Sequence, residues 1–269
     1  MQVPRTHGSA DDDLDRAIEA VREAGELALK RFRTGVKAWR KADGTPVSDA
    51  DLEVDKLLHQ RLTNEWPHYG WHSEESQSQS PSTSERFWLV DPIDGTIAFL
   101  GGNDSWCISL ALIEKGRPIL GIIHAPAQRT IYSAVHGRGA KLNGLPISVS
   151  SRQGLEGARL ILNPSALKPQ HWQNPLPKIE RLTVPSLALR LAHVAQGLCD
   201  GALALSYKHD WDLAAGDLLV SEAQGLVSDL DGRALRYDPG QPRRSGFVGA
   251  NPAIHAAILA RGPLAIGQS

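Results

Sequence analysis

Two aspartates stand three positions apart, at Asp91 and Asp94, in the segment Trp88-Leu-Val-Asp-Pro-Ile-Asp-Gly-Thr96. The apolar run before Asp91 predicts a short strand over residues 87–91, and Pro92 holds its end extended before the strand stops. The residues after Asp94 predict a turn that can begin a helix. Two carboxylates joined by so short a turn can converge on one hard cation, because Mg²⁺ takes oxygen ligands and keeps several waters. The spacing therefore indicates a magnesium site.

Neighbouring groups in the same turn could complete that site. The carbonyl of Ile93 could be a further ligand, and Gly95 and Thr96 offer backbone N–H groups to a phosphate beside the metal. Turn capping by Asx side chains is the ordinary explanation of an isolated Asp-x-x-Asp. The six-residue context of Asp91 and Asp94 favours the metal-site hypothesis instead.

The elements that must position these residues begin with two helices. Apolar residues recur at helical spacing from Leu14 to Phe32 and end at Gly35, which predicts a long amphipathic helix. A second helix is expected after Ser48, with Asp51 three residues after this possible cap. Further strands separated by turn residues predict an antiparallel meander at residues 105–113, 118–125 and 130–135.

After Ser150 strands and helices alternate. Strands are expected near residues 158–162, 201–206, 226–229 and 246–250, and helices near residues 186–196, 212–224 and 252–260. The mixture predicts a layered α/β architecture. We expect an N-terminal α+β lobe, residues 1–150, and a C-terminal α/β lobe, residues 151–269.

Composition and charge exclude several classes of protein. The chain has 269 residues, 41% of them hydrophobic, which suits one globular unit or two packed lobes. Its 29 basic and 30 acidic residues are mixed along the sequence, so neither a nucleic acid polymer nor a membrane surface is expected as a partner. The two cysteines, Cys107 and Cys199, stand apart in apolar stretches and are expected to be reduced. No apolar run approaches the roughly 20 residues of a membrane span, and we expect a cytoplasmic protein.

Other polar segments carry less information. The Ser- and Gln-rich segment from Ser73 to Ser84 predicts a surface loop, which could be a flap over the site or an ordinary solvated loop. None of the ten histidines has a zinc-ligand spacing or lies beside a serine that could form a catalytic triad. His209 is therefore expected to be an ordinary surface histidine.

Three segments resemble the signatures of the inositol monophosphatase family: Ser73-Glu-Glu-Ser76, Asp91-Pro-Ile-Asp-Gly-Thr96 and Trp211-Asp-Leu-Ala-Ala-Gly216. Their order and spacing extend the resemblance over nearly the whole chain. It implies an alternating αβαβα sandwich of two lobes. It also implies a Mg²⁺-dependent, lithium-sensitive phosphatase that acts on a small phosphorylated metabolite and forms a homodimer.

The resemblance also implies a set of ligands for two or three Mg²⁺ ions. Most of them lie in the N-terminal lobe, and Asp212 lies in the C-terminal lobe. The first ion would be held by Glu74, Asp91 and the Ile93 carbonyl, and the second by Asp91, Asp94 and Asp212. Asp51 would help to organise a third ion, although helix capping explains this residue equally well.

Catalysis would use a water molecule in place of a side-chain nucleophile. By the resemblance, Thr96 paired with Glu74 would orient and deprotonate this water, and a bound metal would lower its pKa. Glu75 could tune the first metal or be solvated. The haloacid-dehalogenase phosphatases fit poorly, because their two aspartates are two residues apart and those of this chain are three apart.

The substrate side of the chain departs from the inositol-specific pattern. Those family members carry a glutamate about seven residues before the Trp-Asp motif, where this chain reads Ala202-Leu-Ala-Leu-Ser206. Ser186-Leu-Ala-Leu-Arg190 is similar to a segment of bacterial 3′(2′),5′-bisphosphate nucleotidases, so Ser186 and Arg190 are candidates to bind a second phosphate. An exposed helix arginine is the alternative for Arg190, and Lys208 is a weaker second candidate.

We therefore expect a phosphomonoesterase similar to the bisphosphate nucleotidases. The alternative enzymes are an inositol-1-phosphate phosphatase and a broad-specificity sugar or histidinol phosphatase. The alternative outside catalysis is a phosphate-ligand sensor or a partner-binding subunit. A sensor usually loses a ligand or the activating threonine, and this chain retains all of them.

Overall fold

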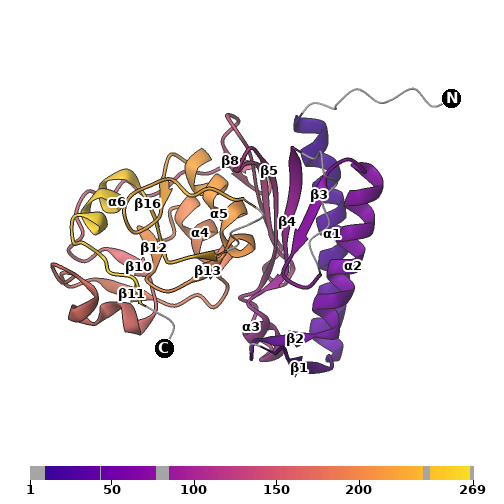
Figure 1. Cartoon of the computed structure of the whole chain (residues 1–269), viewed down its shortest axis with the longest axis horizontal. Coiled ribbons are helices and arrows are strands. Elements are labelled where there is room, and N and C mark those ends of the chain that lie inside the picture. Colours follow the sequence, from indigo (N-terminus) through magenta and orange to yellow (C-terminus); the bar gives the residue numbers. More distant parts are fainter. Residues whose placement is uncertain (1–9, 43, 77–84, 239–242, 267–269) are drawn as a thin grey trace.

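The computed structural model describes residues 10–42, 44–76, 85–238 and 243–266 of the chain. Two β-sheets alternate with three layers of helices (Figure 1). Helices α1 and α2 cover one face of a seven-stranded sheet, α4 and α5 lie between the sheets, and α6 covers the outer face of a five-stranded sheet. The expected αβαβα sandwich is confirmed.

The seven-stranded sheet is mixed. Strand β3 pairs in parallel with β4, and all later neighbours are antiparallel, which confirms the expected meander. Helices cover both faces of its central strands, so these read as continuous apolar runs without alternation. In pairing order the strands are β3 (Gly70–Ser73), β4 (Arg86–Asp94), β5 (Cys107–Glu114), β6 (Arg117–Ala125), β7 (Thr130–Val135), β8 (Ala140–Leu142) and β9 (Leu145–Pro146).

The outer helices are α1 (Ala10–Thr34) and α2 (Asp49–Glu65). The buried stripe of α1 is made of small residues, which let the helix lie close to the sheet: Ala17, Ala20, Val21, Ala24 and Ala28. Indole rings fill the remaining space between these helices and the sheet, and Trp71, Trp88 and Trp106 are almost fully buried. The hairpin of β1 (Ala38–Arg40) and β2 (Pro46–Ser48) joins the two helices.

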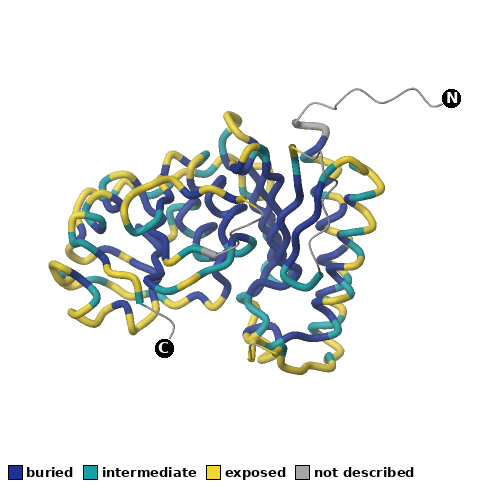
Figure 2. The backbone as a smooth tube through the Cα atoms, in the orientation of Figure 1, coloured by how far each residue is buried: buried dark blue, intermediate teal, exposed yellow. Residues whose placement is uncertain are grey.

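The middle layer consists of α4 (Leu187–Ala195) and α5 (Asp210–Glu222). Most residues of both helices are buried, as expected for helices with a sheet on each side (Figure 2). One hydrophobic cluster runs from β4 and β5 through α4 and α5 to β12 and β16. The two sheets therefore share a core.

The five-stranded sheet is also mixed, and α6 (Pro252–Leu259) packs on β16 and β14. Its strands in pairing order are β11 (Glu180–Leu182), β10 (Arg159–Ile161), β12 (Gly201–Ala204), β16 (Phe247–Ala250) and β14 (Leu226–Ser228). Shorter elements are α3 (Thr96–Leu100), the strand pair β13 (Lys208–His209) with β15 (Arg243–Arg244), and 3-10 turns at 126–128, 164–167 and 169–171. No helix in the described part of the chain is long and apolar enough to cross a membrane.

Two sequence expectations differ from the structure. The strand expected to stop at Asp91 continues to Asp94, because a register shift between these residues absorbs Pro92 and pairing resumes between Asp94 and Cys107. Strand β3 was not expected, since its four buried residues show no alternation. The division into lobes at residue 150 stays a prediction. Residues 77–84 of the Ser-rich loop lie outside the described residues.

A substitution at Gly216, in α5, tests how closely the two helices of the middle layer pack. A Cβ at this position would lie 2.5 Å from Cβ of Leu191, so α4 and α5 would have to separate. We predict that Gly216→Ala lowers the free energy of unfolding by about 1–2 kcal/mol, because overpacking costs more than the roughly 1 kcal/mol that alanine gains in a helix. Urea unfolding measures this change. Gly154→Ala, where a Cβ would meet nothing within 4 Å, is the matched control. Equal stability of the two variants would contradict the packing argument.

Candidate active site

A cavity of about 550 Å³ opens where the β1–β2 hairpin, the end of β4 and the start of α5 meet. Its walls are formed by Lys41, Thr45, Pro46, Glu74, Asp91, Ile93, Asp94, Gly95, Thr96, Ile97, Ala98, Pro185, His209, Trp211 and Asp212. The cavity therefore brings together residues from five separate segments of the sequence, and its volume lies in the usual range for small-ligand sites.

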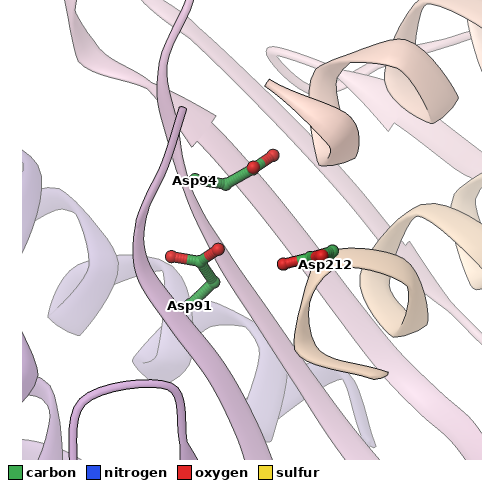
Figure 3. A group of neighbouring side chains, drawn as sticks. All are labelled: Asp91, Asp94 and Asp212. Atoms are coloured by element: carbon green, nitrogen blue, oxygen red, sulfur yellow. The ribbon is translucent and has the colours of Figure 1, made fainter. Parts of the chain in front are cut away.

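Three carboxylates converge in this cavity. Asp91 and Asp94 lie at the end of β4, and Asp212 lies in the first turn of α5 (Figure 3). One oxygen from each side chain lies within 4.8 Å of the other two. The two β4 residues are buried, with exposed fractions of 2% and 7%. These residues are the three aspartates that the sequence predicted for the second magnesium ion.

Burial and mutual repulsion make this cluster unfavourable without a cation. Burial raises the pKa of Asp91 well above its ordinary value, and the nearby charges of Glu74, Asp94 and Asp212 raise it further. Burial and the charges of Asp94 and Glu74 do the same for the pKa of Asp212. A divalent cation removes both penalties, and a donor set made only of oxygens suits Mg²⁺. The residues present therefore fit the metal.

Ser186 and the start of α4 orient Asp94. Oδ2 of Asp94 accepts hydrogen bonds from the Ser186 hydroxyl at 2.6 Å and from the Ala188 backbone N–H at 2.5 Å. The Ser186 oxygen also accepts from the Leu189 N–H at 3.1 Å, so Ser186 is the N-cap of α4. The sequence hypothesis gave Ser186 a substrate contact, whereas in the structure its hydroxyl contacts a metal-ligand candidate.

The turn after β4 also has the geometry that the site requires. The Ile93 N–H donates to Asp91 Oδ1 at 3.0 Å, which is the Asx contact of an ordinary turn. Asp91 also lines the cavity, so one residue both closes the turn and contributes a carboxylate to the site. Gly95 has a φ of 95°, and a Cβ there would lie 3.0 Å from the Ser105 carbonyl oxygen. Only glycine fits this close approach without strain.

Thr96 lies beside Asp51. The Thr96 hydroxyl lies 3.1 Å from the Ile93 carbonyl oxygen and 3.5 Å from Asp51 Oδ1. Oδ2 of Asp51 accepts from the Ser48 N–H at 2.8 Å and from its hydroxyl at 2.5 Å. Asp51 therefore both caps α2 and contacts a cavity residue. Burial raises the pKa of Asp51 to about 6.

Glu74 lines the cavity but lies outside the cluster of three aspartates. Lys41 Nζ donates to Glu74 Oε1 at 2.9 Å and to Glu75 Oε1 at 2.7 Å. The Thr96 hydroxyl contacts Asp51, whereas its expected partner Glu74 is paired with Lys41. The Glu75 side chain is only 4% exposed, which contradicts the solvated alternative. Sequence reasoning missed Lys41 because nothing local links it to a pair of glutamates 33 residues later.

Two aromatic residues beside Asp212 line the cavity, whereas the predicted substrate residue Arg190 and the weaker candidate Lys208 are not among its lining residues. His209 stacks on Trp211 with ring centroids 4.4 Å apart, and both line the cavity, so the expectation of an ordinary surface histidine was wrong. Arg190 is half-buried, with Nε donating to the Val184 carbonyl at 2.7 Å. Lys208 Nζ donates to the Tyr207 carbonyl at 2.8 Å. The charge of Asp212 acts on both of these basic groups.

The repulsion within the cluster predicts how metal-free stability depends on pH. A raised pKa in the folded state means that the folded protein binds the proton more tightly, so stability falls as pH rises above the ordinary carboxyl pKa of 3.8. We predict that Asp91→Asn has a higher free energy of unfolding than the wild type when both are measured with a chelator at pH 8, because the amide carries no charge to be desolvated or repelled. Mg²⁺ should raise the melting temperature of the wild type and leave that of the variant nearly unchanged.

Asp200→Asn is the matched control for this measurement. Asp200 is equally buried, but its carboxylate is satisfied by the Ser150 hydroxyl at 2.7 Å and the Arg159 N–H at 2.8 Å. Asp200→Asn should therefore not raise the free energy of unfolding of the metal-free protein. A gain for Asp200→Asn equal to that for Asp91→Asn would contradict the repulsion argument.

The sequence and the fold also match known proteins. The family model described as "Inositol monophosphatase family" matches residues 10–262. The 3′(2′),5′-bisphosphate nucleotidase CysQ of Aggregatibacter actinomycetemcomitans is 32% identical over 259 residues, which are 88% of this chain and 90% of that protein. The Nus factor SuhB of Escherichia coli K12 is 30% identical over 257 residues, 92% of this chain and 94% of SuhB. The Thermotoga maritima IMPase structure superposes with a TM-score of 0.81 at 28% identity, covering 93% of this chain and 96% of that one. The chain belongs to the inositol monophosphatase family.

Proposed function

We propose that the chain is a Mg²⁺-dependent phosphomonoesterase. The observation that carries this proposal is the convergence of Asp91, Asp94 and Asp212 in a cavity that Thr96 also lines, with Asp51 beside the Thr96 hydroxyl. Family membership supports it, since the family is one of Mg²⁺-dependent phosphomonoesterases. Lithium sensitivity, a homodimer and a cytoplasmic location are further proposals that rest on the family alone.

The three aspartates, with Glu74 and the Ile93 carbonyl, would hold two or three Mg²⁺ ions. When bound, Mg²⁺ supplies Lewis-acid chemistry that lowers the pKa of water and offsets the negative charge of the phosphate. The backbone N–H groups of Gly95 and Thr96 would bind phosphate oxygens at the start of α3.

Thr96 and Asp51 are the groups that would move a proton. A water molecule bound to the Thr96 hydroxyl would donate toward it, and this hydroxyl would in turn donate to Asp51 Oδ1, at 3.5 Å. With a pKa of about 6, Asp51 is mostly ionised at neutral pH and close to the range in which a general base is most effective. Such contacts commonly shorten when substrate binds. A transfer of this kind leaves no covalent intermediate on the protein.

The proposed substrate class is that of the bisphosphate nucleotides. Burial lowers the pKa of Arg190 and of Lys208, and the nearby charge of Asp212 opposes this shift in both. These two cations would face a second phosphate beside the one that is hydrolysed. The nucleotidase CysQ among the relatives supports this choice. Inositol 1-phosphate and sugar or histidinol phosphates are the alternative substrates.

A partner-binding role without turnover is the second candidate, and the similarity to the Nus factor SuhB favours it. The two candidates differ in whether the carboxylate cluster performs catalysis. Loss of turnover on removing one carboxylate charge therefore distinguishes them.

We predict that Asp94→Asn lowers kcat of the Mg²⁺-dependent phosphatase reaction more than tenfold, a loss of more than about 1.4 kcal/mol of transition-state stabilisation. The fold should persist, because the amide oxygen can still accept from Ser186 and Ala188. Turnover and thermal melting are measured together, with Asp200→Asn as the control that keeps activity. A variant that retains more than about a tenth of wild-type kcat would refute the role of Asp94.

Substrate preference provides a separate prediction. We expect a higher kcat/KM for adenosine 3′,5′-bisphosphate than for inositol 1-phosphate, because residues 202–206 offer no carboxylate to ring hydroxyls. Arg190→Ala should raise KM for the bisphosphate about tenfold or more, the value of a charge-assisted contact of about 1.5–3 kcal/mol. KM for a nucleoside monophosphate should change little. Equal losses on both substrates would assign Arg190 to structure, through its bonds to the Val184 and Pro185 carbonyls.

A further inference from the structure

A bidentate ion pair lies at the start of α5, outside the cavity walls. Arg244, on β15, donates from Nε to Asp210 Oδ1 and from Nη2 to Asp210 Oδ2, both at 2.8 Å. The two side chains are 17% and 4% exposed. Nη2 of Arg244 also donates to the Arg236 carbonyl. The guanidinium is therefore held in one orientation, and Asp210 is held with it.

The strand pair of β13 and β15 connects the Arg244–Asp210 ion pair to the cavity. β13 and β15 are antiparallel, with Lys208 opposite Arg244 and His209 opposite Arg243. Asp210 is the first residue of α5, and Asp212 follows two residues later. The His209 N–H donates toward Asp212 Oδ2 at 3.4 Å. The chain segment paired with β15 therefore includes His209, which lines the cavity, and leads directly to Asp212, a candidate metal ligand.

A second contact restrains the same helix further along. The Tyr237 hydroxyl donates to Asp217 Oδ2 at 2.8 Å, and both side chains are buried. Asp217 lies seven residues after Asp210, about two helical turns, so both contacts fall on one face of α5. The Arg244 guanidinium lies 5.9 Å from the Tyr237 ring centroid. The segment that contains Tyr237 and Arg244 therefore holds α5 at two points.

We infer that Arg244 is a positioning residue for the carboxylate cluster: through Asp210 it fixes the start of α5 and so the place of Asp212. The inference rests on the proposed function of that cluster. Asp212 is repelled by Asp94 and Glu74, and the first turn of a helix leaves backbone N–H groups without partners inside the helix. The pair with Arg244 opposes this displacement from outside the cavity. Partners that orient metal ligands typically change metal affinity by 10–100-fold when they are removed.

The test measures Mg²⁺ binding directly, by titration calorimetry on the whole chain after chelator treatment. Arg244→Gln should weaken Mg²⁺ affinity about 10–100-fold. Arg244→Lys, which keeps the charge but cannot form both bonds, should weaken it less, and it remains informative if the glutamine variant does not fold. Phosphatase assays should show that the lost kcat/KM returns in part at high Mg²⁺ concentration.

Arg31→Lys is the matched control. Arg31 of α1 forms a similar two-bond pair with Glu53 of α2, and neither residue lines the cavity. Its substitution should leave Mg²⁺ affinity unchanged. Arg244 variants that lower the melting temperature but bind Mg²⁺ as tightly as the wild type would overturn the inference and assign the pair to stability. A wild type that binds no Mg²⁺ would instead refute the proposed metal site, and the inference with it.

Discussion

The repulsion among three carboxylates in one buried place is the constraint on which the site depends. Asp91, Asp94 and Asp212 have oxygens within 4.8 Å of one another, and burial denies them the water that would screen their charges. A chain without restraints would relax by moving them apart. Each is instead held in place by the elements around it. Asp91 lies at the register shift of β4, Asp94 accepts a hydrogen bond from the Ser186 N-cap of α4, and Asp212 follows the Asp210–Arg244 ion pair at the start of α5. At neutral pH the fold therefore maintains an arrangement that a bound cation would make favourable.

The layered architecture explains how these restraints meet. Asp91 and Asp94 come from the seven-stranded sheet, whereas Asp212 comes from a helix packed between both sheets. A single hydrophobic cluster spans the sheets and the middle helices, so their relative position is fixed by a shared core. The first turn of α4 connects the two proposed parts of the site, because its Ala188 N–H contacts Asp94 and the same turn carries Arg190. The proposed metal site and the proposed contact with a second phosphate therefore depend on the position of one helix.

The sequence predicted what depends on local order. The turn from Asp91 to Thr96, the meander and the main helices follow from spacing. That Asp212 lies beside Asp91 and Asp94 was implied only by the family resemblance, and the structure does place the three side chains together. Contacts between distant segments could not be predicted in this way. Three contacts of this kind join residues whose sequence neighbours give no sign of the partner. They are the ion pair of Lys41 with Glu74, the contact of Thr96 with Asp51 and the ion pair of Arg244 with Asp210. His209 was misjudged for the same reason, since its stacking on Trp211 depends on how α5 begins.

The central claim is that the three aspartates bind divalent cations together. Diffraction from crystals of the chain soaked with Mn²⁺, which replaces Mg²⁺ and scatters anomalously, tests this most directly. We expect anomalous peaks in the cavity that share Asp91 as a ligand and also contact Asp94 or Asp212, and none of these peaks should remain after Asp91→Asn. Full occupancy by Mn²⁺ elsewhere in the molecule, with the three carboxylates bound to no metal, would contradict it.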